Sequence, residues 1–144
     1  MTQDPENKRD HVVNGLVNSD GPLDQDTTFF ATIFLDSPIG IYIVQNGKFI
    51  FVNPEFQKIS GFNEKELLGT ESLKIVLPED RDRVRNNAIQ MSKGDRHVPY
   101  EHRVVTKSGE IRWIIETVTS IHYKNRRAVL GYFMDHTEHE RAKE

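Results

Sequence analysis

The stretch from Thr106 to Ile115 constrains the fold of this chain more than any other. It joins two runs that are rich in β-branched and aromatic residues, 98–106 before it and 110–123 after it. Gly109 gives the backbone freedom that a tight turn requires, and the two residues before it are polar. The pattern predicts a β-hairpin in the second half of the chain, with the upstream residues covering one of its faces.

The remaining elements predict an α+β fold. Asn46-Gly47 lies between two apolar runs, which is a strong signal for a first hairpin. Asn53 before Pro54, and Asn63 three residues before Glu66, are typical of helix starts. The expected strands are 39–44, 48–52, 98–106, 110–123 and 127–135, and the expected helices between them are 53–60, 63–69 and 79–92. Strands grouped on both sides of the helices predict a five-stranded antiparallel sheet with connecting helices on one face and a flanking helix at each end.

Composition limits the function. The chain has 144 residues and a net charge of −3, which suits one globular domain and does not favour nucleic acid or an anionic membrane as a partner. It has no cysteine, so disulfides, thiolate chemistry and Cys-ligated zinc are excluded. No apolar run approaches the roughly 18 residues of a membrane span, and we predict a cytoplasmic location. We divide the chain into a flexible N-terminal arm or linker (1–27), a folded domain (28–136) and the start of a C-terminal signalling helix (137–144).

Short motifs along the chain resemble those of the PAS domain, or sensory box, of bacterial and archaeal signal-transduction proteins. Their order and spacing carry the resemblance: Phe51 to Phe56, Ser60 to Gly69, Leu77 to Asp80, Glu101 with Arg103, Lys107 to Trp113, and Asp135-His136-Thr137. The resemblance implies a non-enzymatic sensory domain that binds a small ligand or a partner. It also implies that the signal passes through the terminal helices to an effector such as the histidine kinase of a two-component system.

Two alternatives stay open: a ligand-free homodimerisation module, and a redox or gas sensor with non-covalent flavin or haem. Photosensors of this family that bind flavin covalently need a cysteine, which this chain lacks. Haem sensors of the family place a histidine early in the long connecting helix, and 79–92 contains none. We therefore predict no cofactor, although non-covalent flavin is not excluded. His136 and His139 are interpreted as surface residues, and we predict no metal site and no catalytic residues.

The register of the second hairpin determines the predicted pocket. If Lys107 pairs with Glu110, then Arg103 and Glu116 share one face, and the opposite face, with His102, is the more apolar. Composition alone would bury that apolar face, whereas the resemblance directs the Glu116 face toward the pocket. Following the resemblance, we predict a ligand pocket, polar at the Arg103 end, that is formed by Arg103, Ile114, Glu116, Val118, Val129, Gly131 and Phe133.

Residues at the two ends of the domain are predicted to form a dimer interface and a coupling point. Phe30, Ile33 and Phe34 on a first helix, with Trp113 on the outer sheet face, predict a homodimer interface. Asp135 and Thr137 are predicted to couple the sensor to an effector domain. Thr137 lies three residues before Glu140, a spacing that predicts a capping box and a helix starting at this point.

Overall fold

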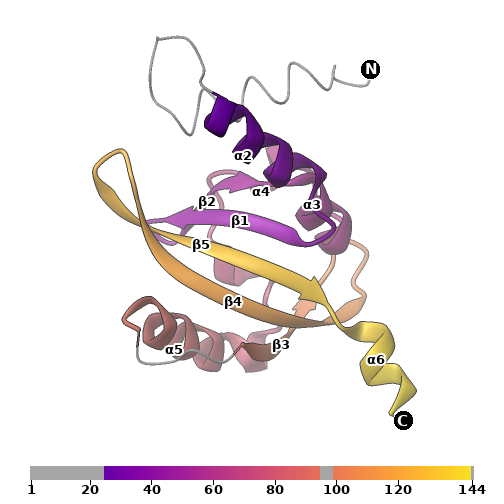
Figure 1. Cartoon of the computed structure of the whole chain (residues 1–144). Helices are drawn as coiled ribbons and strands as arrows, with labels where there is room; N and C mark the ends of the chain where they lie inside the picture. Colours follow the sequence, from indigo (N-terminus) through magenta and orange to yellow (C-terminus); the bar gives the residue numbers. More distant parts are fainter. Residues whose placement is uncertain (1–24, 95–98, 144) are drawn as a thin grey trace.

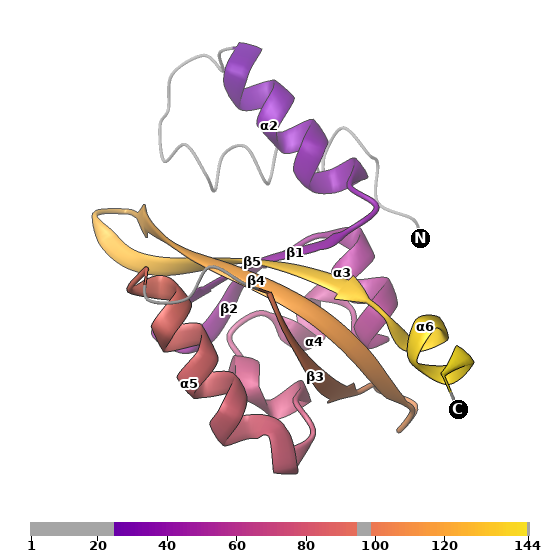
Figure 2. The ribbon, with the colours of Figure 1, turned by 60° about the horizontal axis from the view of Figure 1, so that its bottom comes forward.

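The computed structural model describes residues 25–94 and 99–143. Its centre is a five-stranded antiparallel sheet in the order β2-β1-β5-β4-β3. The strands are β1 (Gly40–Gln45), β2 (Lys48–Val52), β3 (Tyr100–Val105), β4 (Ile111–Tyr123) and β5 (Arg126–Asp135). Figures 1 and 2 show one helix, α2 (Gln25–Asp36), over one face of the sheet and the connecting helices on the opposite face. The predicted α+β fold is confirmed.

The helices α3 and α4 begin where the sequence signals predict them, whereas α5 begins at Arg81, two residues later than predicted. Asn53 caps α3 by accepting from the backbone N–H of Phe56 at 2.9 Å. Asn63 and Glu66 form the predicted capping box at the start of α4. The helices are α2 (Gln25–Asp36), α3 (Pro54–Ser60), α4 (Glu64–Leu67), α5 (Arg81–Ser92) and α6 (Thr137–Ala142), with 3-10 turns η1 (Ser72–Ile75) and η2 (Pro78–Asp80). The helix α2 takes in the last residues of the predicted arm 1–27, whose first 24 residues lie outside the described residues.

The register predicted for the β3–β4 hairpin is wrong by one residue. The backbone N–H of Thr106 donates to the carbonyl of Glu110 at 2.8 Å, so the loop contains three residues rather than two. The third loop residue, Gly109, has φ +89°, as expected for a three-residue loop that ends in the left-handed region. His102 consequently lies opposite Ile114, and the inner face carries Tyr100, His102, Val104, Ile114, Glu116 and Val118 together.

Each face of the sheet has its own apolar cluster. The larger one lies between the inner face and the connecting helices, with Phe56 and Phe133 at its centre. The smaller one lies under α2, where Phe34 is buried against Ile41 and meets Phe51 edge-on. Within the described ranges, none of the helices combines the length and apolar character needed to cross a membrane.

Candidate functional site

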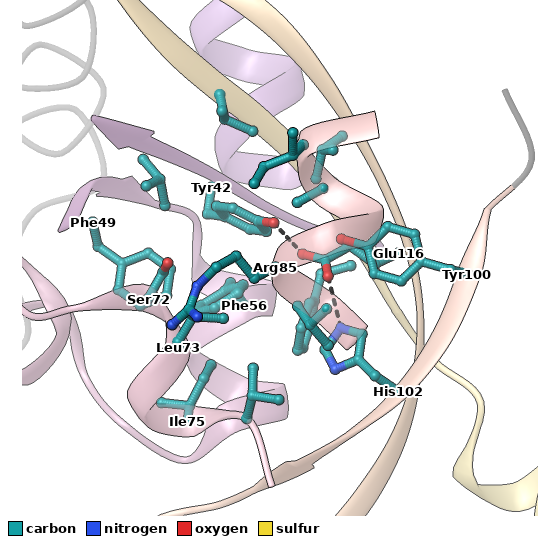
Figure 3. Close-up of a pocket in the computed structure, with 18 residues that line it drawn as sticks. Tyr42, Phe49, Phe56, Ser72, Leu73, Ile75, Arg85, Tyr100, His102 and Glu116 are labelled. Carbon is teal, nitrogen blue, oxygen red and sulfur yellow. Dashed lines mark hydrogen bonds and ion pairs between the residues drawn. The ribbon is translucent and has the colours of Figure 1, made fainter. Parts of the chain in front are cut away.

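A cavity of about 180 Å³ lies between the inner sheet face and the helical layer (Figure 3). Its wall is mainly apolar and comes from all five strands on the sheet side and from α3, η1 and α5 on the helix side. The apolar residues of the wall include Val44, Phe49, Leu73, Ile75, Val76, Val84, Ala88, Val118 and Val129. Such a wall favours a compact apolar molecule over water.

One end of the cavity is polar. The hydroxyl of Tyr42 donates a hydrogen bond to Oε1 of Glu116, and Nε2 of His102 lies 2.7 Å from Oε2 of the same carboxyl group. All three residues are buried. Burial, and next the negative charge of Glu116, raise the pKa of Tyr42 well above its ordinary value. Tyr42 therefore keeps its proton and acts as a donor to Glu116.

The second ring nitrogen of His102, Nδ1, is buried and has no hydrogen-bond partner among the described residues. Since Nε2 faces Glu116, it carries the proton that the carboxylate accepts. In the neutral ring Nδ1 is then an acceptor, and in the charged ring it is a donor. A buried polar atom without a partner is costly, and His102 lines the cavity, so a bound molecule that reaches this nitrogen would gain affinity.

A glycine makes this polar end possible. Tyr42 on β1 and Glu116 on β4 are separated by β5, where Gly131 lies opposite Tyr42. A Cβ on Gly131 would overlap the ring of Tyr42. Because Gly131 has no side chain, the Tyr42 ring crosses β5 and reaches Glu116.

The predicted pocket residues fall into three groups. Glu116, Val118, Val129 and Phe133 line the cavity. Ile114 is fully buried in the core beyond the cavity wall, and Gly131 lies beneath Tyr42. Arg103 does not line the cavity, because the one-residue difference in register places it on the opposite face of β3. Tyr42 had no predicted role, and His102 lies on the inner face rather than on the predicted outer face.

Arg103 instead pairs with Asp80 of η2. Its Nε and Nη2 atoms donate to the two carboxylate oxygens at 3.0 and 2.7 Å, and its backbone N–H donates to Oδ2 at 2.9 Å. These bonds, the side-chain ones most of all, lower the pKa of Asp80 to about 2. The guanidinium group also lies over the ring of Trp113, 5.4 Å from its centroid. The polar end predicted from Arg103 is therefore a separate cluster that ties η2 to β3.

The predicted coupling residues meet where β5 ends and α6 begins. Asp135 accepts from the backbone N–H of Thr137 at 2.9 Å and from its hydroxyl at 2.6 Å, and it pairs with Arg112 at 3.0 Å. The Thr137 hydroxyl accepts from the backbone N–H of Trp113 at 3.0 Å.

The predicted capping box of α6 is wrong. His136 occupies the N-cap position and makes no side-chain capping bond, while Thr137 is the first helical residue. The hydroxyl of Thr137 is directed to Asp135 and β4, so it is not available for the N–H of Glu140, which bonds the carbonyl of His136.

The predicted dimer residues are not equally exposed. Phe34 is buried on the side of α2 that packs against the sheet, and Trp113 is half-buried beneath Arg103. Ile33 is 46% exposed, and the side chain of Phe30 lies outside the described residues. Other large apolar side chains that reach the surface of α2 and of β5 are Phe29, Tyr132 and Met134.

Two features of the structure bear on whether a metal ion or an organic cofactor fits this chain. Among the described residues, one set of potential metal ligands lies close together: Glu101, His136 and Glu140, with ligand atoms within 4.8 Å of one another. Nε2 of His136 is 3.5 Å from each carboxylate, distances that ion pairing also explains. The cavity is close in size to the cavity of about 150 Å³ that holds a single benzene. It is too small for the fused rings of flavin or haem.

Comparisons with known proteins agree with the fold. A family model described as PAS fold matches residues 49–132, more than half of the chain, and the chain belongs to this family. PAS domains are sensory modules of signal-transduction proteins. A search of curated proteins gave no match.

Solved PAS structures cover most of the chain. A PAS domain from Colwellia psychrerythraea is 20% identical with a TM-score of 0.73, over 79% of this chain and 99% of that one. A sensory box histidine kinase/response regulator from Burkholderia thailandensis E264 is 25% identical with a TM-score of 0.60, over 80% and 88%. A LOV protein from Rhodobacter sphaeroides is 17% identical with a TM-score of 0.62, over 84% and 76%.

Proposed function

We propose that this PAS domain senses a small molecule bound in the inner cavity and relays binding through its terminal helices to an effector such as a histidine kinase. The observation that carries the proposal is an apolar cavity that ends in the buried cluster of Tyr42, Glu116 and His102. A core built only for stability would avoid burying a carboxyl group beside an incompletely bonded ring.

The strand pair β4–β5 supports a route for the signal. Glu116, at the polar end of the cavity, pairs with Phe133. Two residues along the same ladder, Ile114 pairs with Asp135, which holds the start of α6. A ligand that moves the Glu116 carboxyl group would therefore act on the strand pair that positions α6.

Mass spectrometry of freshly purified protein under native conditions tests ligand binding. We expect a fraction of the chains to carry an extra mass of about one ring compound, and this mass to leave on denaturation. The matched control is the triple variant Y42F/H102L/E116L, which lacks the polar cluster and should fold and carry less of the extra mass. Protein without any bound mass that also fails to bind single-ring compounds added at millimolar concentration would contradict the proposal.

Homodimerisation is a second proposal, supported by the apolar side chains that α2 exposes, Phe29 and Ile33 at 68% and 46%. We expect sedimentation to show a dimer at micromolar concentration, and Ile33→Asp to give a monomer. A wild-type monomer at high micromolar concentration would reject the dimer.

An absorbance spectrum of the purified protein tests the flavin and haem alternatives, and we expect no visible bands. The cytoplasmic location and the lack of enzymatic activity stay predictions.

A further inference from the structure

We infer that the ligand is a single-ring compound with a hydroxyl group, and that this hydroxyl binds Nδ1 of His102 at the buried end of the cavity. The inference rests on the proposed function, since it names the class of ligand that this cavity takes. Three features carry it: the size of the cavity, the unpartnered nitrogen at its end, and the charge beside that nitrogen.

Size limits the ligand to about one ring. A cavity of about 150 Å³ lined by apolar residues holds one benzene, and this cavity has about 180 Å³. The additional room corresponds to a substituent rather than to a second ring. The rings of Phe49, Phe56 and Phe133 lie in the wall and provide edges and faces against which an aromatic ring packs.

The polar end requires a group that both donates and accepts. The carboxyl group of Glu116 already accepts a hydrogen bond from Tyr42 on one oxygen and one from His102 on the other. In the part of the chain that the structure describes, Nδ1 of His102 has no hydrogen-bond partner, and its side chain is only 1% exposed. It accepts a hydrogen bond in the neutral ring and donates one in the charged ring, and a hydroxyl group satisfies either form.

Charge argues against an acidic group at this end. The negative charge of Glu116 lies next to His102, and like charges in a buried site repel strongly. The cation of the wall, Arg85, has a side chain that is 57% exposed and pairs with Asp82 at 3.6 Å. Arg85 lies apart from the buried cluster of Tyr42, Glu116 and His102 (Figure 3). The ligand group that binds at the buried end is therefore determined by His102 and Glu116.

Phenol and benzene are matched probes because they differ by one hydroxyl group. We expect the full chain, followed by NMR titration, to bind phenol at least about tenfold more tightly than benzene, the effect of one hydrogen bond to a buried partner. His102→Leu should reduce this ratio to about one. Arg85→Ala also changes the cavity wall but leaves the buried end intact, and it should keep the ratio.

His102→Leu leaves one oxygen of Glu116 without its partner and can destabilise the fold, so the triple variant Y42F/H102L/E116L is the second test. It removes the three polar groups of the cluster together and should bind benzene and phenol with about equal affinity. Equal affinities in the wild type, an unchanged ratio in both His102 variants, or no binding of either probe at millimolar concentration would overturn the inference. If native mass spectrometry shows another kind of compound in the cavity, the inference fails while the proposed function stands.

Discussion

Asp80 and Glu116 are both buried carboxylates, and the regions around them differ in how completely their partners are bonded. Asp80 receives three hydrogen bonds from Arg103, and the guanidinium group rests on Trp113. Glu116 accepts hydrogen bonds from Tyr42 and His102, but Nδ1 of His102 has no hydrogen-bond partner among the described residues. Both oxygens of Asp80 are bonded to Arg103, whereas in the second region a cavity adjoins a cluster with an unbonded nitrogen.

This difference separates a structural role from a binding role. A complete cluster stabilises the fold and gains nothing from a ligand, because every strong donor and acceptor is already used. An incomplete cluster facing a cavity costs stability, and a ligand can recover that cost on binding. Burial alone does not distinguish the two regions, since the side chains of Asp80 and Glu116 are both 5% exposed.

The largest expected effect comes from breaking the complete cluster. Asp80→Ala removes the partner of Arg103 and should lower the free energy of unfolding by about 3 kcal/mol, near the low end for breaking a buried pair because Arg103 is partly exposed. Urea unfolding followed by the fluorescence of Trp113 measures this loss. Phenol affinity should not change, and a variant as stable as the wild type would show that the cluster is not structural.

Acid should act on the same cluster. The pKa of Asp80 in the folded chain, about 2, lies below its ordinary value of 3.8. The pair of Asp80 and Arg103 therefore stabilises the fold when the pH is above 3.8, the ordinary pKa. This contribution, about 2 kcal/mol, is lost as the pH falls from about 5 to 2. Asp80→Asn should be less stable at neutral pH and lose less stability over this range. Parallel pH profiles for the variant and the wild type would contradict the assignment.

Thr137 is a third buried polar group, and its hydroxyl is bonded on both sides. Thr137→Ala leaves Asp135 and the backbone N–H of Trp113 without this partner and should cost about 1 kcal/mol. In a fusion to a histidine kinase, Thr137→Ala and Asp135→Ala should also change kinase output while phenol binding persists. Thr119→Ala, at an exposed position on β4, is the control and should leave output as in the wild type. Unchanged output from the two junction variants would leave the junction as a structural link only.

The smallest stability effect is expected in the cavity. Replacing His102 and Glu116 by Leu together with Tyr42→Phe removes the whole buried polar cluster and leaves no unpaired donor or charge behind, so stability should stay within about 1 kcal/mol of the wild type. Thermal unfolding checks this. A loss as large as that of Asp80→Ala would mean that the two regions do not differ as proposed.

The sequence predicted those parts of the fold that depend on neighbouring residues. Asn53 and Asn63 cap helices, and Asn46-Gly47 turns the first hairpin with both residues at positive φ, because each signal acts within a few residues. The β3–β4 register was missed because the turn residues allow either a two-residue or a three-residue loop, and the position of Gly109 distinguishes them only in three dimensions.

The site was predicted only in part. The resemblance oriented Glu116 correctly and the apolar pattern favoured burying His102, but the wrong register placed these residues on opposite faces. Tyr42 was missed because its link to Glu116 crosses β5 above Gly131, a contact between residues 74 positions apart. Sequence spacing carries no signal for such a contact, although a glycine in the middle of a strand indicates close approach of another group.

The imidazole nitrogens of His102 show most directly whether the incomplete cluster is a ligand site. In ¹⁵N spectra of the full chain, the resonances missing from His102→Leu identify this ring among the six histidines. Phenol should shift the Nδ1 resonance of His102 and leave Nε2 nearly unchanged, and benzene should shift neither by a similar amount. Phenol that saturates the protein without moving Nδ1 would contradict the account.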